Sequence, residues 1–254
     1  METIGLIAAM PQESDALLRL IPEKQPAWTA GLRGYRFELF GRQCLLVESG
    51  IGLERAAQAT RALIAAAHPH LLVSFGIAGA TDSDLEIGDV VIAACSYLLE
   101  GDLAGQPRPL ASLSAEAWHS ATDLLGRRGA EVFHGVAIST RGSQLILPAG
   151  ETLEHPVLEM ETAAVAQAAY QANLPLLAIR SISDGPQAPL PFDLQAITGD
   201  DYQLRKAELI KTLLRRPQIL LQAPGMLQNM GMAAEHAAIA VIAILGQPAP
   251  LISG

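Results

Sequence analysis

The sequence LLVSFGIAGA at residues 71–80 joins an apolar run, Leu71–Phe75, to a glycine-rich segment. An apolar run of this length that ends at glycine predicts a buried strand. A second such run, Ile4–Ala9 (IGLIAA), leads into Pro11, which suits the first turn of a helix that continues to about Leu20. Buried strands that alternate with helices indicate a parallel sheet covered on both faces.

The rest of the chain continues this alternation. We therefore predict a single α/β domain over residues 1–254, with a central mixed, mostly parallel twisted sheet and helices on both faces. Its core spans about residues 1–187, and a helical C-terminal extension spans about 193–247. The further predicted strands are 35–40 and 43–48 (a hairpin), 89–94, 132–138 and 175–182, and the further helices are 53–67, 114–126 with Ser114 as N-cap, 161–172 and 202–214.

Composition narrows the class of protein. The chain has 254 residues, of which 50% are hydrophobic, and a net charge of −9 without a run of Lys or Arg. A nucleic-acid partner is therefore not expected, because such binding depends on clustered cations. Two cysteines cannot build a disulfide framework, and the N-terminus lacks the cationic start of a signal peptide. The longest uninterrupted apolar run, Ala237–Leu245, is far shorter than the roughly 20 residues of a spanning helix, so we expect a cytoplasmic protein.

Acidic and small residues follow several predicted strands. Glu13 comes after the first strand and Asp184 after the strand that ends near Ile182, while Glu159 and Glu161 stand at the start of a helix. The carboxyl ends of parallel strands meet at one edge of a sheet, where ligands bind. Three remote acids, Glu13, Glu161 and Asp184, could therefore share one cleft. Each acid could instead simply stabilise the start of a helix.

Motifs for other chemistries are incomplete. Gly50-Ile51-Gly52 begins a dinucleotide fingerprint, but Arg55 stands where its third glycine is required. The acidic segment Asp82–Glu86 lacks the glycine position and the closing glutamate of a calcium loop. His68-Pro69-His70 is more typical of a helix-to-strand junction than of a metal site. These incomplete motifs support neither a metal site nor a dinucleotide cofactor.

Six segments occur in order at characteristic spacings. Together they resemble the nucleoside phosphorylase/nucleosidase superfamily, most closely its methylthioadenosine/S-adenosylhomocysteine nucleosidase branch. The segments are Ile4–Glu13 (IGLIAAMPQE), Ser49–Gly52 (SGIG), Gly76–Gly79 (GIAG), Ile87–Val91 (IGDVV), Leu158–Ala163 (LEMETA) and Arg180–Asp184 (RSISD).

The resemblance implies roles for individual residues. Asp184, preceded by Ser183, would protonate the departing purine, and Glu13 would activate the attacking water. Glu161 would hold the ribose hydroxyls, with Met160 against the sugar. The remaining implied substrate contacts are Glu159, Ile77, Ala78, Gly79, Ser49, Gly50 and Ser139. The resemblance further implies a nucleoside substrate, neither a metal nor an organic cofactor, and a homodimer or larger homo-oligomer.

The chemistry of N-glycosidic cleavage fits three carboxyl groups. The transition state resembles an oxocarbenium ion, as in glycoside hydrolysis. Adenine leaves poorly as an anion, so an acid whose pKa is raised by burial must supply a proton. A second carboxylate can accept a proton from water, and the charge of a third favours the cationic sugar.

The sequence also departs from the nucleosidase pattern. Ile77 replaces a serine whose hydroxyl phosphorylases use for phosphate, which favours hydrolysis, although phosphate remains a candidate co-substrate with Arg33, Arg36 and Arg55 as its contacts. Residues 139–146 (STRGSQLI) replace the segment that usually grips the purine.

The C-terminal region leaves three alternatives open. It is similar to the hopanoid-associated phosphorylase subgroup, which acts on an adenosyl-hopane, so Met226–Leu245 could serve an apolar 5′ group or contact a lipid surface. The same apolar spacing also suits packing on the core or on a second subunit. The altered segment at residues 139–146 permits a further alternative, a non-catalytic nucleoside-binding module on the same fold.

Overall fold

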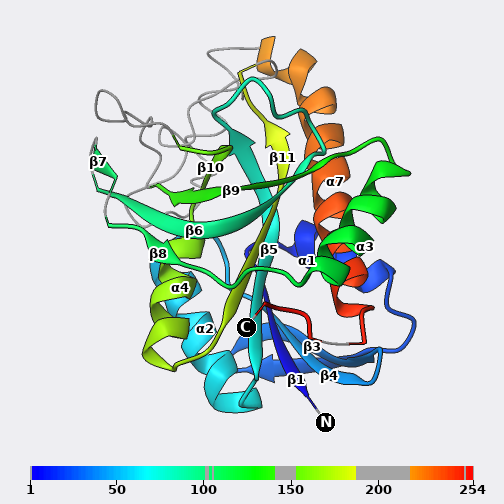
Figure 1. Ribbon diagram of the computed structural model, residues 1–254, viewed down its shortest axis with the longest axis vertical. Helices are drawn as coiled ribbons and strands as arrows, with labels where there is room; N and C mark the ends of the chain where they lie inside the picture. The colour runs from blue at the N-terminus through cyan, green and yellow to red at the C-terminus, as the bar shows by residue number, and fades with distance from the viewer. Residues whose placement is uncertain are drawn as a thin grey trace.

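A mixed β-sheet runs through the centre of the computed structural model, and helices cover both of its faces (Figure 1). The structure describes residues 2–100, 103–104, 106–140, 153–186, 218–248 and 250–253. The α/β class and the covered sheet are confirmed. The elements are β1 (Thr3–Ala8), α1 (Pro11–Arg19), β2 (Gln25–Thr29), β3 (Leu32–Leu39), β4 (Arg42–Glu48), α2 (Leu53–Ala67), β5 (Leu71–Ala80), β6 (Val90–Glu100), β7 (Leu103–Ala104), β8 (Arg108–Pro109), α3 (Ala115–Gly126), β9 (Val132–Ser139), β10 (Pro156–Glu159), α4 (Thr162–Gln171), β11 (Leu176–Asp184) and α7 (Gln218–Leu245).

The central strands are parallel and buried. The sheet order is β10-β9-β6-β11-β5-β1-β4-β3-β2, and β4, β1, β5 and β11 run in the same direction. Strand β10 also pairs with β5, which closes β5, β11, β6, β9 and β10 into a ring. Six of the described strand pairings are antiparallel and five are parallel, and the parallel ladders are longer on average, so the sheet is mixed with a parallel centre, as predicted.

Several strands differ from the sequence prediction, and three of them show why. Strand β5 does not end at Phe75 but continues through the glycines to Ala80, because β11 stays paired with it along this length. Residues Pro156–Glu159, predicted as the approach to a helix, form β10, and the helix starts only at Thr162. Strand β2 was not predicted, since it is a mostly exposed edge strand with a proline, Pro26.

Apolar residues at helical spacing attach the helices to the sheet. Helices α2 and α4 cover one face, where Ala56, Ala59 and Leu63 of α2 are completely buried (Figure 1). Helices α1, α3 and α7 cover the other face. The predicted N-cap of α3 is confirmed, since the Ser114 hydroxyl accepts a hydrogen bond from Ala117 N at 3.3 Å. Both faces of the central strands are therefore dry, which rigidly fixes the strand ends that carry the site.

The C-terminal helix α7 is a layer of the core. Its segment Pro224–Leu245 has the length and mean hydropathy, 1.2, of a membrane span, yet 56% of the apolar window is buried inside the protein. It packs on β11 and β5 and against α1 and α3. The predicted C-terminal helix is present, and these contacts are those of a core helix. The predicted helix near residues 202–214 lies outside the described residues.

Arg42 fastens the end of α7 to the start of β4. Its buried guanidinium donates to Leu245 O at 2.9 Å and Pro248 O at 3.1 Å and pairs with Glu2 at 3.1 Å. We expect Arg42→Ala to lower the free energy of unfolding by about 2–3 kcal/mol, because hydrogen bonds from a charged donor are lost in a buried place. Urea denaturation measures the change, and the exposed Arg36→Ala serves as a control that should stay within about 0.5 kcal/mol of wild type. Equal stability of both variants would contradict this role.

Candidate active site

The predicted edge of the sheet carries the candidate site. Strands β1, β4, β5 and β11 are parallel, so their carboxyl ends, near Ala8, Glu48, Ala80 and Asp184, lie at one edge. Helices α1 and α2 begin directly after β1 and β4 at the same edge. Because each loop there is short, the side chains that follow these strands converge.

Glu13 lies in the first turn of α1 and is 3% exposed. Its Oε2 accepts hydrogen bonds from Ala9 N at 2.8 Å and Met10 N at 2.9 Å, which caps the helix. Its Oε1 accepts from Ile77 N of β5 at 3.0 Å. Burial raises the pKa of Glu13, while these backbone donors and the charge of Arg180 oppose the rise. Capping of α1 uses only Oε2. The hydrogen bond between Oε1 and Ile77 N of β5 additionally fixes the carboxyl group at the candidate site.

Glu161 reaches the same place from the N-terminus of α4. Its Oε1 accepts a hydrogen bond from Gly52 N at 2.8 Å, which ties the start of α4 to the start of α2. Burial and the nearby negative charge of Glu159 raise the pKa of Glu161 to about 8, and the charge of Glu13 adds to the rise. Burial and the like charge of Glu159 therefore favour the protonated form of Glu161 in the free protein.

A small cavity joins these acids to an arginine. It has a volume of about 10 Å³ and is lined by Glu13, Glu161 and Arg180 together with Ile7, Ala9, Ser49, Ser74, Phe75 and Ile77. A polar cavity of this size is about the smallest that holds one water molecule. Two carboxyl groups and one guanidinium therefore face a space that fits a single water.

Asp184 ends β11 further along the sheet edge. Its Oδ1 accepts a hydrogen bond from the Ser183 hydroxyl at 2.6 Å, and its Oδ2 lies where a side chain on Gly79 would begin. Burial raises the pKa of Asp184, and the Ser183 hydrogen bond only partly opposes the rise. A raised pKa keeps a carboxylic acid protonated closer to neutral pH, as a proton donor requires.

Two glycines of β5 make room for the acids. A Cβ on Gly76 would overlap the carboxyl group of Glu13, and one on Gly79 would lie 2.8 Å from Asp184 Oδ2. The glycine-rich end of LLVSFGIAGA is therefore required by the close approach of two carboxyl groups. Three residues of strand separate these two points by roughly 10 Å. Side chains three residues apart on a regular strand point to opposite faces, and Asp184 does not line the small cavity with Glu13 and Glu161.

Arg180 was not predicted as a site residue. It stands inside an otherwise apolar strand, is 3% exposed, and forms an ion pair with Glu159 at 3.2 Å. A charged residue in a buried strand has to be paired. The arginine within the apolar run of β11 was therefore the signal in the sequence that pointed to a buried partner and to a role in the site. Arg180 also contacts Ser74 Oγ at 2.8 Å and Thr162 Oγ1 at 2.7 Å.

Glu159 and Ser139 lie behind the cavity. Their side chains are buried and hydrogen-bonded to each other at the paired ends of β10 and β9. Burial alone would raise the pKa of Glu159, but the charge of Arg180 and hydrogen bonds from Ser139, Thr162 and Glu161 together lower it. The structure thus surrounds both predicted substrate contacts with protein groups.

The other predicted contacts lie at the rim or in the core. Ser49 and Ile77 line the small cavity, and Gly50 adopts a positive φ of 77° in the turn after β4. Met160 is half-buried between Glu159 and Glu161, whereas Ala78 is buried in an apolar cluster with Leu85 and Val91. The segment predicted to grip the purine falls outside the described residues from position 141 onward.

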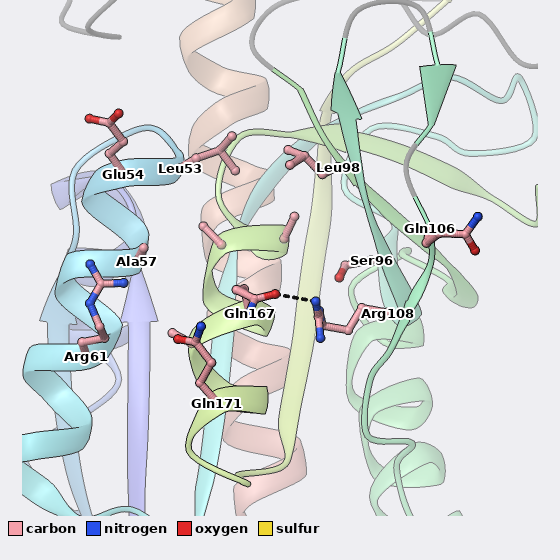
Figure 2. A pocket seen from close by; sticks show the side chains of 13 residues that line it. Leu53, Glu54, Ala57, Arg61, Ser96, Leu98, Gln106, Arg108, Gln167 and Gln171 are labelled. Carbon is pink, nitrogen blue, oxygen red and sulfur yellow. Dashed lines mark hydrogen bonds between the residues drawn. The ribbon is translucent and has the colours of Figure 1, made fainter.

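A larger hollow lies elsewhere, between α2, α4, β6 and β8 (Figure 2). Its volume is about 380 Å³, and none of Glu13, Glu161 and Asp184 lines it. Arg108 and Gln167 hydrogen-bond across it, as the dashed line in Figure 2 marks. Size alone would select this hollow, but the buried acids with shifted pKa values are at the sheet edge, so the chemistry is assigned there. Over the described part of the chain, no group of three His, Cys, Asp or Glu side chains is placed to hold a metal ion.

The fold is that of an α/β enzyme, and its candidate site is a set of buried carboxyl groups at the carboxyl edge of a mixed sheet. Residues 3–215 match the family model of the phosphorylase superfamily, and the chain belongs to this family.

Relatives in this family are known by sequence and by structure. The 5′-methylthioadenosine/S-adenosylhomocysteine nucleosidase of Listeria innocua is 32% identical over 235 residues, covering 83% of this chain and all of the relative. That of Listeria welshimeri is 32% identical over 214 residues, covering 75% of this chain and 91% of the relative. The nucleosidase structure from Neisseria meningitidis, with methylthio-immucillin-A, has a TM-score of 0.67 at 22% identity and covers 97% of this chain and 99% of that one.

A second structure extends the agreement in fold. The nucleosidase from Colwellia psychrerythraea, in complex with adenine, has a TM-score of 0.69 at 22% identity and covers 99% of this chain and 96% of that one. These matches span nearly the whole chain. The C-terminal helix is therefore part of the shared fold, and its presence does not by itself distinguish a hopanoid-associated enzyme from a nucleosidase.

The raised pKa of Glu161 predicts a pH-dependent cost in stability. A carboxyl group whose pKa is about 8 when folded and 4.5 when unfolded favours the folded state below pH 4.5, and this contribution is lost as the pH rises through 8. We expect Glu161→Gln to melt higher than wild type at pH 9, by roughly 2–4 °C for each kcal/mol gained, with no such gain at pH 4.5. Melting curves of both proteins, beside the exposed Glu154→Gln, measure this. An equal difference at both pH values would count against the assigned pKa.

Proposed function

We propose that the protein hydrolyses the N-ribosyl bond of an adenine nucleoside with an apolar 5′ substituent and releases the base. The Listeria relatives, which are 5′-methylthioadenosine/S-adenosylhomocysteine nucleosidases by name, support this reaction at 32% identity. The observation that carries the proposal is the small cavity lined by Glu13, Glu161 and Arg180.

The acids divide the chemistry between them. Asp184, whose pKa burial raises, protonates the departing base. Glu13 accepts a proton from a water in the small cavity as that water attacks the sugar. Glu161 receives the sugar hydroxyls, and in its ionised form its charge stabilises the cationic transition state. Each role requires a carboxyl group and no other reactive side chain.

The same cavity favours water over phosphate as the nucleophile. Two carboxyl groups face it, and a carboxylate repels a phosphate anion but can accept a hydrogen bond from water. Of the arginines considered for phosphate, Arg33 is engaged by Glu48 at 2.8 Å and by Asp15 at 3.1 Å, and Arg36 is exposed on an edge-side strand. Hydrolysis is therefore proposed rather than phosphorolysis.

The position of helix α7 supports the proposal that the substrate carries an apolar 5′ group. A Cβ on Gly231 of α7 would lie 3.9 Å from Gln12, the neighbour of Glu13, so the helix passes beside the site. Leu227 and Met232, on the same part of α7, are 58% and 36% exposed. These exposed apolar residues also favour a second candidate, phosphorolysis of an adenosyl-hopane by a hopanoid-associated enzyme. Contact with lipid and assembly as a homodimer stay predictions.

One experiment separates the candidates. The protein is incubated with adenosine, 5′-methylthioadenosine and S-adenosylhomocysteine, with and without inorganic phosphate, and the base and sugar products are identified. We expect adenine and free sugar at a rate that phosphate does not change. Sugar 1-phosphate formed only with phosphate would instead support phosphorolysis, and tight binding without base release over hours would indicate a binding module.

A further inference from the structure

The buried guanidinium of Arg180 is held by several groups, of which only Ser74 lines the water-sized cavity. It lines that cavity, yet its hydrogen bonds run to Ser74, Thr162 and Glu159 and to its neighbour Ile179 O at 2.9 Å. The ion pair of Arg180 and Glu159 has both side chains at most 3% exposed. Removing a charge from water is costly unless a partner compensates it, and Glu159 compensates the buried charge of Arg180.

The carboxylate of Glu159 is enclosed by protein donors. Its Oε1 accepts from the Ser139 hydroxyl, and its Oε2 accepts from Thr162 N at 2.7 Å, from Glu161 N at 2.9 Å and from Arg180. Each carboxylate oxygen offers about two acceptor positions, so Oε2 is fully used, and the position left on Oε1 belongs to a side chain that is only 1% exposed. Burial therefore shields Glu159 from a sugar hydroxyl, and the influence of Glu159 on a substrate has to pass through other residues.

We propose that Glu159 is a positioning residue: its carboxylate holds the Arg180 guanidinium at the water cavity and fixes the first turn of α4, so that Glu161 faces the same cavity. The inference rests on the proposed hydrolysis, since it concerns the residues that surround the attacking water. Ser139 supports Glu159 in turn, because its hydroxyl donates to Glu159 and accepts from Ala163 N at 2.7 Å.

The ion pair between Arg180 and Glu159 also preserves the ability of Glu13 to accept a proton. Without Glu159, the guanidinium would be neutralised by the other acids at the cavity, Glu13 from α1 and Glu161 from α4. A carboxylate paired to arginine is a weaker proton acceptor, because the positive charge favours the ionised form of the carboxyl group. With Glu159 in place, Glu13 is held by neutral backbone donors. The remaining lining residues carry no charge; they are Ile7, Ala9, Ser49, Ser74, Phe75 and Ile77.

The test compares Glu159→Gln with wild type in the pH dependence of kcat/KM for adenine release. We expect kcat to fall about 100-fold, the scale on which a misplacement near 1 Å acts. We also expect the acidic limb of the kcat/KM profile to shift to lower pH by roughly one unit. The shift is expected because, once the negative charge of Glu159 is lost, Arg180 can stabilise ionised Glu13. Glu154→Gln, an exposed glutamate of the same segment, should match wild type in both respects.

The outcomes are distinct. A Glu159→Gln enzyme with an unmoved acidic limb overturns the proposal, whatever its rate, because a purely structural role would lower activity at every pH alike. If Glu159→Gln does not fold, Glu159→Asp takes its place: it keeps the charge but shortens the reach, so kcat should fall at least tenfold while the limb stays, and a wild-type kcat would overturn the proposal. Failure of wild type to release any base would instead reject the proposed hydrolysis.

Discussion

Replacing Asp184 by asparagine should lower the rate of adenine release by about 10²–10⁴-fold, the usual contribution of a general acid. Asparagine has the same shape and still accepts the hydrogen bond from Ser183. It has no acidic proton to give, so the base would have to leave as an anion. Release of adenine from 5′-methylthioadenosine, followed by its change in absorbance or by chromatography, measures the effect.

Two controls keep this result specific. Asp123 is an exposed aspartate on α3, and Asp123→Asn should retain the wild-type rate. Melting temperatures should show that Asp184→Asn is folded at the assay temperature. Full activity in a folded Asp184→Asn protein would remove Asp184 from the role of acid and leave the proposed reaction without a proton donor.

The central sheet could be predicted because its local and tertiary signals agree. The runs Ile4–Ala9 and Leu71–Phe75 are apolar on both faces, and a strand of this kind is stable only between two layers. The edges and the short strands could not be predicted in this way. Strand β10 has only four residues, and its pairing with β9 and β5, rather than its own pattern, makes it a strand.

The glycines of β5 show how a local reading can mislead. Gly76 and Gly79 indicate a loop when the sequence is read alone, because glycine usually ends a strand. In the structure they stay in the strand, and the carboxyl groups of Glu13 and Asp184 occupy the space of the missing side chains. The requirement is set by residues more than 60 positions away, so no window around the glycines contains it.

The acids of the candidate site could be predicted from the sequence, but their contacts with other residues could not. Glu13, Glu161 and Asp184 follow from strand ends and from the family resemblance, and the structure brings Glu13 and Glu161 to one cavity. Glu159 was assigned to the substrate because it neighbours Glu161 in sequence. Only its burial and the four donors around it show that it serves Arg180, since these donors come from three separate elements, β9, the start of α4 and β11.

Glu13→Gln gives the second large expected effect, a loss of kcat of about 10²–10⁴-fold with little change in nucleoside affinity. The amide cannot accept a proton from water, whereas the sugar and base are held elsewhere in the site. Its nitrogen also has to face Ile77 N or the donors Ala9 N and Met10 N, so stability should fall by about 1 kcal/mol.

The combination of measurements makes this prediction informative. Calorimetry should show that Glu13→Gln binds the nucleoside with an affinity within a few-fold of wild type. The rate of adenine release should fall by about 10²–10⁴-fold, as given above. Glu38→Gln, an exposed glutamate on β3, should leave both unchanged. A folded Glu13→Gln protein that binds and hydrolyses normally would mean that Glu13 only caps α1. A variant that loses binding and turnover together would place Glu13 against the sugar, and the water-sized cavity would then need another base.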